Sequence, residues 1–178
     1  MRSETIARNY AEALFTLGEQ SGQTELYADL MDAVAGAVET SPDIQAMLMS
    51  PRVPKAEKSR LLSAALEESA PREFVLFLQA VVKRGRQQLF GEIAREYLGL
   101  LDIKLNRVRA GVTVAREPNQ AMRDAIAAAL NEALGKEVLP SYHVDPAILG
   151  GAIVRVGERI YDGSVRRRMT RLRRELLK

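Results

Sequence analysis

Hydrophobic residues in the first hundred positions recur at the three- and four-residue spacing that is typical of amphipathic helices. Glycine, proline and capping residues divide this stretch into short segments of helical length. Six helices are expected, beginning near Ser3, Thr24, Ser41, Pro54, Pro71 and Leu89. A series of short helices with apolar faces predicts a six-helix bundle over residues 1–105.

The hydrophobic period changes after Asn106. Four apolar residues then alternate with polar or small ones, namely Val108, Ala110, Val112 and Val114. A two-residue repeat of this kind is typical of a half-buried strand. An Ala-rich helix, a second strand, a hairpin and a final helix are expected at residues 119–134, 138–144, 152–161 and 165–176. The pattern therefore predicts a mainly α chain with a smaller α+β part, a β-α-β-β-α domain over residues 106–178.

Composition places the chain among soluble globular proteins, because 47% of its 178 residues are hydrophobic and 28% are charged. Cysteine is absent, which excludes disulfides, thiolate catalysis and Cys-based metal sites. The most apolar run, residues 74–82, is interrupted by Gln79 and is much shorter than the roughly 20 residues that span a bilayer. Any membrane association is therefore expected to be indirect. The N-terminus lacks the pattern of a secretory signal peptide, so secretion is not indicated.

Positive charge is concentrated at the C-terminal end. Residues 155–178 carry nine Lys or Arg and three acidic residues, a net charge of +6, whereas residues 1–154 carry a net charge of −3. In the final helix, six arginines surround an apolar stripe of Val165, Met169, Leu172 and Leu176. Such a helix can be a solvated face, a surface for an acidic protein, or a nucleic-acid-binding surface. No aromatic residue follows Tyr161, so the helix has no platform for base stacking.

Few residues could support catalysis. His143 is the only histidine and lies in an expected strand, so we interpret it as structural rather than as part of a metal site or a Ser-His-Asp relay. The glycines of residues 150–157 fit a turn and a bend better than a phosphate-binding motif. Asp162 and Ser164 fit a loop and a helix cap, with an anion-binding helix start as the alternative. A hydrolase built on them would lack a base. We therefore expect no catalytic residue, no cofactor and no metal site.

Two helices have more apolar surface than one-sided packing requires. The first carries one apolar line of Ile6, Tyr10, Ala13 and Leu17 and an adjacent line of Ala7, Ala11, Leu14 and Gly18. The fifth is apolar on nearly every side between Phe74 and Val82. Such a helix either lies at the centre of the bundle or contributes to a groove for another helix, and the pattern alone leaves both open.

Two segments carry a family resemblance. The opening segment Ala7-Arg8-Asn9-Tyr10-Ala11-Glu12-Ala13-Leu14-Phe15 resembles the first helix of ATP synthase delta subunits, which are related to the mitochondrial oligomycin-sensitivity-conferring protein. The more specific match is the segment from Gly150 to Val165, followed by the basic helix. The resemblance covers essentially the whole chain. Glu158 departs from it, because the family usually has aspartate at this turn position.

The resemblance implies a non-catalytic stator subunit of the rotary proton-translocating ATP synthase, at the cytoplasmic face of the bacterial inner membrane, with no cofactor and no nucleic acid bound. A nucleic-acid-binding module that uses the Arg-rich helix is the alternative function. The resemblance implies that the first and fifth helices bind the N-terminal helix of an alpha subunit through Ile6, Tyr10, Ala13, Leu17, Phe74, Phe77, Leu78 and Val81. It also implies that the C-terminal domain holds the b-subunit dimer of the peripheral stalk, with Gly150, Gly151, Asp162, Gly163 and Ser164 shaping the contact.

Overall fold

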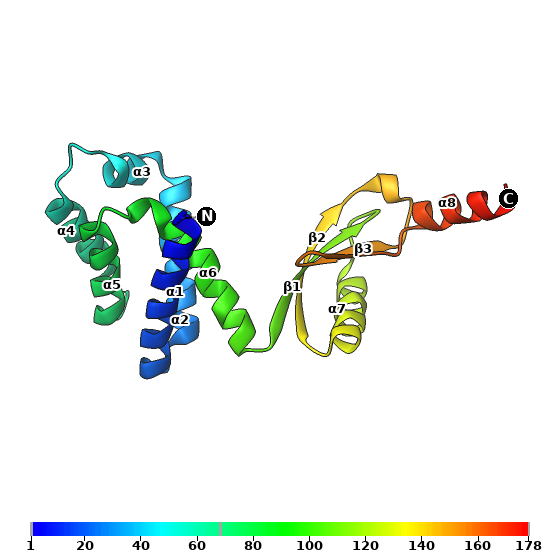
Figure 1. The fold of residues 1–178 in the computed structure, drawn as a ribbon, viewed down its shortest axis with the longest axis horizontal. Helices are drawn as coiled ribbons and strands as arrows, with labels where there is room; N and C mark the ends of the chain where they lie inside the picture. The colour runs from blue at the N-terminus through cyan, green and yellow to red at the C-terminus, as the bar shows by residue number, and fades with distance from the viewer. Residues whose placement is uncertain (1, 68, 178) are drawn as a thin grey trace. The chain divides into compact units, whose positions relative to one another are not determined.

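The computed structural model describes residues 2–67 and 69–177, so Lys178 of the basic segment lies outside the described residues. The protein is mainly helical with a small mixed four-stranded sheet, as the sequence predicts (Figure 1). It divides into two compact units, Met1–Leu101 and Asp102–Lys178. The division falls within the sixth helix, slightly before the boundary expected after residue 105.

The helical unit is built from helices joined by short turns. Their bounds are α1 Arg2–Ser21, α2 Thr24–Thr40, α3 Pro42–Met49, α4 Lys55–Leu66, α5 Arg72–Lys83, the short 3₁₀ turn η1 Gln87–Leu89 and α6 Phe90–Lys104. Ser41 caps α3 as expected, because its hydroxyl accepts a hydrogen bond from the Ile44 N–H. Helix α1 already begins at Arg2, so Ser3 lies inside its first turn and does not cap it.

Aromatic side chains hold the core of the helical unit together. Tyr27 of α2 and Phe74 of α5 are fully buried, with ring centroids 5.6 Å apart. Tyr97 of α6 packs at the edge of Phe15, with centroids 5.5 Å apart, and its hydroxyl donates to the Thr24 carbonyl at 3.0 Å. These contacts bind α1, α2, α5 and α6 to one another.

The C-terminal unit consists of a sheet, one helix packed on it and a terminal helix. The element bounds are β1 Arg107–Val114, α7 Gln120–Leu134, β2 Glu137–Val144, the 3₁₀ turn η2 Pro146–Ile148, β3 Ala152–Val156, β4 Arg159–Asp162 and α8 Val165–Leu176. The strand order is β2-β1-β3-β4, in which β1 pairs in parallel with β2 and antiparallel with β3, and β3 pairs antiparallel with β4. Strand β1 is therefore internal, and β2 and β4 form the two edges.

Helix α7 covers one face of this sheet (Figure 1). The inward residues of β1 are those of the predicted alternation, since Ala110, Val112 and Val114 are buried, and Ile126 and Leu130 of α7 pack against them. Asn119 and Gly135 delimit α7, the first as N-cap and the second in the left-handed conformation at φ 63°. In the described part of the chain, no helix combines the length and the apolar character that crossing a membrane requires.

Candidate partner-binding surfaces

Helix α1 buries one of its two apolar lines in its own unit. Ala7, Ala11 and Leu14 are completely buried. Gly18 lies so close to Tyr97 that a Cβ atom added to it would meet the Tyr97 Oη at 2.8 Å. The other line, which we name the α1 stripe, consists of Ile6, Tyr10, Ala13 and Leu17. Three of its residues are half-buried and Ala13 is exposed, so the α1 stripe keeps apolar surface that a partner can contact.

Helix α5 buries one of its faces and exposes the other. All four residues that the sequence analysis placed in a groove on this helix are buried, namely Phe74, Phe77, Leu78 and Val81. Leu76, which is 51% exposed, lies in a shallow pocket with Ser63 of α4. The four side chains pack into the helical unit, and their part in binding a partner helix stays a prediction. The exposed face of α5 carries Glu73, Leu76, Ala80 and Lys83.

The α1 stripe meets α5 at an aromatic contact. Tyr10 packs edge-on against Phe77, with ring centroids 6.1 Å apart and an angle of 75° between the planes. The guanidinium of Arg86 lies 5.7 Å from the centre of the Tyr10 ring, a cation–π arrangement. The Tyr10 hydroxyl is buried, and no described residue forms a hydrogen bond with it. Phe77, 8% exposed, is thus the α5 residue of the predicted set that borders the stripe.

The glycine-rich segment before α8 is a tight packing junction. Gly151 has a φ of 75°, and a Cβ atom at this position would overlap the carbonyl oxygen of Gly163. The Gly163 N–H donates to the Ala152 carbonyl, and the Val165 N–H donates to the Gly150 carbonyl, both at 3.0 Å. These hydrogen bonds attach the start of α8 to the start of β3. The glycines are therefore required by the backbone geometry of the chain itself.

Asp162 and Ser164 complete this junction. Ser164 is 2% exposed, and its hydroxyl caps α8 by accepting a hydrogen bond from the Arg167 N–H at 3.2 Å. Asp162 accepts from the Ser164 N–H at 2.9 Å. This backbone hydrogen bond, followed by one from the Ser164 hydroxyl and by the nearby arginines, lowers the pKa of the Asp162 carboxyl. Because Ser164 is buried and caps α8, it positions the helix. Its part in the stalk contact stays a prediction.

Helix α8 exposes both its apolar stripe and its arginines. The α8 stripe comprises Val165, Met169, Leu172 and Leu176, whose exposed fractions rise along the helix from 38% to 84%. Among the described residues, Arg167 forms an ion pair with Asp162 and Arg171 one with Glu175, whereas Arg168, Arg173 and Arg174 form none. An amphipathic helix with an uncovered apolar stripe is a surface for another helix.

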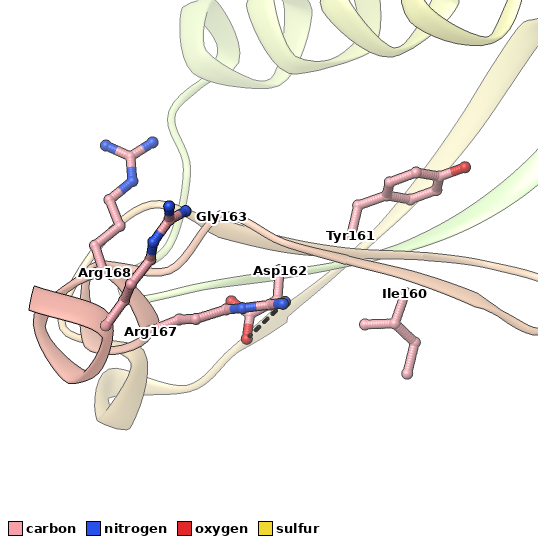
Figure 2. Close-up of a pocket in the computed structure, with 7 residues that line it drawn as sticks. Ile160, Tyr161, Asp162, Gly163, Arg167 and Arg168 are labelled. Carbon is pink, nitrogen blue, oxygen red and sulfur yellow. Dashed lines mark ion pairs between the residues drawn. The ribbon is translucent and has the colours of Figure 1, made fainter. Parts of the chain in front are cut away.

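A hollow of about 590 Å³ lies beside this helix. Figure 2 shows Arg167 directed at Asp162 across the hollow, with an ion-pair distance of 3.9 Å, and Ile160 and Tyr161 on opposite sides of β4. Ile160 and Tyr161 are 61% and 49% exposed. From the sequence, both are expected only as residues of a hairpin. Two successive apolar residues in a short edge strand were the available signal, since one of them must face away from the helix that covers the sheet.

His143 is exposed on β2, the edge strand, beside Thr113 of β1. In the described residues, no group of three or more His, Asp or Glu side chains is arranged to hold a metal ion. The Ser164 hydroxyl is committed to its cap.

Comparison with known proteins gives a consistent family. A family model described as ATP synthase delta (OSCP) subunit matches residues 6–176. The chain belongs to this family. It is 43% identical over 176 residues to the ATP synthase subunit delta of Gemmatimonas aurantiaca, covering 99% of this chain and 95% of the relative. It is 37% identical to the subunit of the same name from Anaeromyxobacter sp. strain Fw109-5, covering 97% of each.

A solved structure shares the fold. A chain of the cryo-EM structure of the Toxoplasma gondii mitochondrial ATP synthase hexamer superposes with a TM-score of 0.71, covering 97% of both chains at 20% identity. The family assignment confirms the resemblance of residues 7–15 and 150–165. The protein is accordingly a non-catalytic structural subunit of the ATP synthase stator.

Proposed function

We propose that this chain links the catalytic head of the ATP synthase to its peripheral stalk, so that the head resists the torque of the rotor. Helices α1–α6 act as a six-helix bundle, residues 1–105, that binds the N-terminal helix of an alpha subunit. Residues 106–178 bind the b-subunit dimer. The assembly lies at the cytoplasmic face of the bacterial inner membrane, and the chain binds no nucleic acid.

The exposed α8 stripe is the observation that carries the stalk contact. A stable monomer rarely leaves four successive stripe residues uncovered, because burial of each apolar side chain away from water lowers the free energy. With Ile160 and Tyr161 on β4, α8 offers apolar and cationic surface in the same unit. This combination suits the b-subunit helices if these carry acidic residues beside their apolar ones. Gly150, Gly151, Asp162, Gly163 and Ser164 support this contact by fixing α8.

The α1 stripe carries the contact to the head. Ala13 is the exposed residue of the stripe, and a small residue at this position allows the backbone of a second helix to approach closely. Tyr10 and Phe77 form the floor beside it. The buried residues of α5, Phe74, Leu78 and Val81, support this floor from inside the core and do not contact the partner directly.

The head contact is tested by titrating the full-length chain with a synthetic peptide of the alpha-subunit N-terminus in a calorimeter. The variant Ala13→Glu places a charge in the middle of the stripe without disturbing a buried side chain. We expect it to weaken peptide binding by at least about 30-fold, the effect of losing a hot spot of about 2 kcal/mol. The matched control is Thr16→Glu, at an exposed α1 position outside the stripe, which should bind like the parent chain. Equal affinities for the two variants would refute the head contact on α1.

A further inference from the structure

An apolar cavity that is open to solvent lies in the helical unit, on helices other than α1. It has a volume of about 360 Å³ and lies between α2, α3 and α4. Only Ala, Val, Ile, Leu and Met side chains line it, among them Ala37 of α2, Leu48 of α3 and Leu62 of α4. Volumes from about 300 Å³ upward are typical of small-molecule sites. With no polar side chain in its lining, the cavity suits a hydrocarbon chain rather than a ligand that needs hydrogen bonds.

The cavity is accessible from solvent at α4. Leu61 lines it and is 40% exposed, whereas Leu48 and Leu62 on its inner wall are buried. A chain-like ligand could therefore enter beside Leu61 and displace little of the existing core.

A buried cation lies one helical turn from this entrance. Lys58, on α4 one turn before Leu61 and Leu62, is only 4% exposed. Its ammonium donates one hydrogen bond, to the Ser50 carbonyl at 2.8 Å, at the end of α3 where Leu48 lines the cavity. None of the ion pairs among the described residues includes Lys58, although an ammonium has three N–H donors. A buried charge without a counter-ion favours an anionic ligand.

We propose that this cavity binds the hydrocarbon chain of a single-chain carboxylate amphiphile, a fatty-acid type of molecule, whose carboxylate pairs with Lys58. The apolar lining selects the chain and the ammonium selects the head group. The site is separate from the α1 stripe and the α8 stripe, so it does not depend on the proposed stator contacts.

The first measurement is a calorimetric titration of the full-length chain with octanoate, decanoate and dodecanoate, each below its micelle concentration. We expect saturable binding at one site that tightens by about fourfold per added methylene group, the value for burying a methylene. Ala65→Leu adds bulk inside the cavity, because Ala65 lines it, and should abolish binding. The control Ala64→Leu changes the adjacent residue, which does not line the cavity, and should leave binding intact. Absence of saturable binding, or equal binding by the two variants, would overturn the proposal.

The head group is tested with 1-decanol, which has the same chain length and no charge. Decanoate should bind at least about tenfold more tightly than decanol, and Lys58→Met should remove this preference while decanol still binds. Retained decanol binding shows that the variant is folded. Equal affinity of the parent chain for the two ligands would overturn the pairing with Lys58. Binding to vesicles of anionic phospholipid without any binding of free decanoate would also overturn it, since the partner would then be a membrane surface.

Discussion

Gly151 and Gly163 approach each other so closely that a single Cβ atom at Gly151 would overlap the Gly163 carbonyl oxygen. This approach brings the start of β3 against the start of α8, and the hydrogen bond from the Val165 N–H to the Gly150 carbonyl closes the junction. The orientation of the arginine helix relative to its sheet therefore depends on two residues that have no side chain.

Replacement of Gly151 by alanine should destabilise the C-terminal unit by more than about 2 kcal/mol, because the new Cβ combines a steric overlap with a φ of 75°. The control is Gly111→Ala in β1, where nothing lies within 4 Å of an added Cβ. That variant should be neutral or slightly stabilising, since glycine weakens a strand interior. Amide hydrogen exchange followed by NMR measures the opening free energy of β1 and β3 directly. Equal protection in both variants would show that the junction can relax.

A second close approach couples α1 to α6. A methyl group at position 18 would meet the Tyr97 hydroxyl at 2.8 Å, and the same hydroxyl donates to the buried Thr24 carbonyl. Gly18→Ala and Tyr97→Phe should each cost about 1–3 kcal/mol of unfolding free energy. The double variant should cost less than the sum, because phenylalanine leaves room for the methyl group. Urea denaturation of the four proteins gives the coupling, and strict additivity would contradict the contact.

The buried Tyr97 also predicts a loss of stability at alkaline pH. Burial, more than the neighbouring groups Tyr27 and Glu19, raises the pKa of Tyr97 above its ordinary value of 10.0. The folded state therefore holds this proton more tightly than the unfolded state. The contribution of Tyr97 to the free energy of unfolding is therefore complete below pH 10 and decreases as the pH rises above 10. Thermal melts between pH 9 and 11 should show a melting temperature that falls more steeply with pH for the parent chain than for Tyr97→Phe. An equal decline in both proteins would contradict this prediction.

Tyr10→Phe should leave the helical unit as stable as the parent chain or more stable. The Tyr10 hydroxyl is buried, and no described residue forms a hydrogen bond with it, so its removal spares the cost of an unsatisfied donor. The ring contact with Phe77 is retained. A clear drop in the midpoint of urea denaturation would mean that the hydroxyl has a partner, such as bound water.

The local boundaries of the elements follow from the sequence because they depend on neighbouring residues. Ser41, Asn119 and Ser164 each accept the backbone hydrogen bond expected of an N-cap, and Gly85 and Gly135 adopt the left-handed conformation that ends a helix. The alternation of β1 likewise identifies its buried face. The predicted start of α1 at Ser3 was wrong, since a serine can lie inside the first turn of a helix as well as before it.

Features that depend on distant residues could not be predicted. The order of the strands places β1 between β2 and β3, which no local pattern specifies. The apolar sequence of α5 does not specify which of its faces is buried, because that depends on contacts of Phe74 with Tyr27 and of Phe77 with Tyr10. Lys58 lies in a charged stretch that is typical of an exposed helix face. Its side chain is nevertheless buried, and its ammonium donates a hydrogen bond to the Ser50 carbonyl. The family resemblance supplied the partners, which the residues alone left open.

The central claim is that one chain carries two independent partner surfaces, the α1 stripe and the α8 stripe. The most direct test is a crossed titration of Ala13→Glu and Leu172→Glu, each against an alpha-subunit N-terminal peptide and a soluble b-subunit dimer, with Thr16→Glu and the uncharged Thr170→Gln as exposed controls outside the stripes. We predict that Ala13→Glu loses only the peptide, that Leu172→Glu loses only the b dimer, each by at least about 30-fold, and that both controls bind both partners. Loss of the b dimer in Ala13→Glu, or undiminished b-dimer binding in Leu172→Glu, would contradict the account.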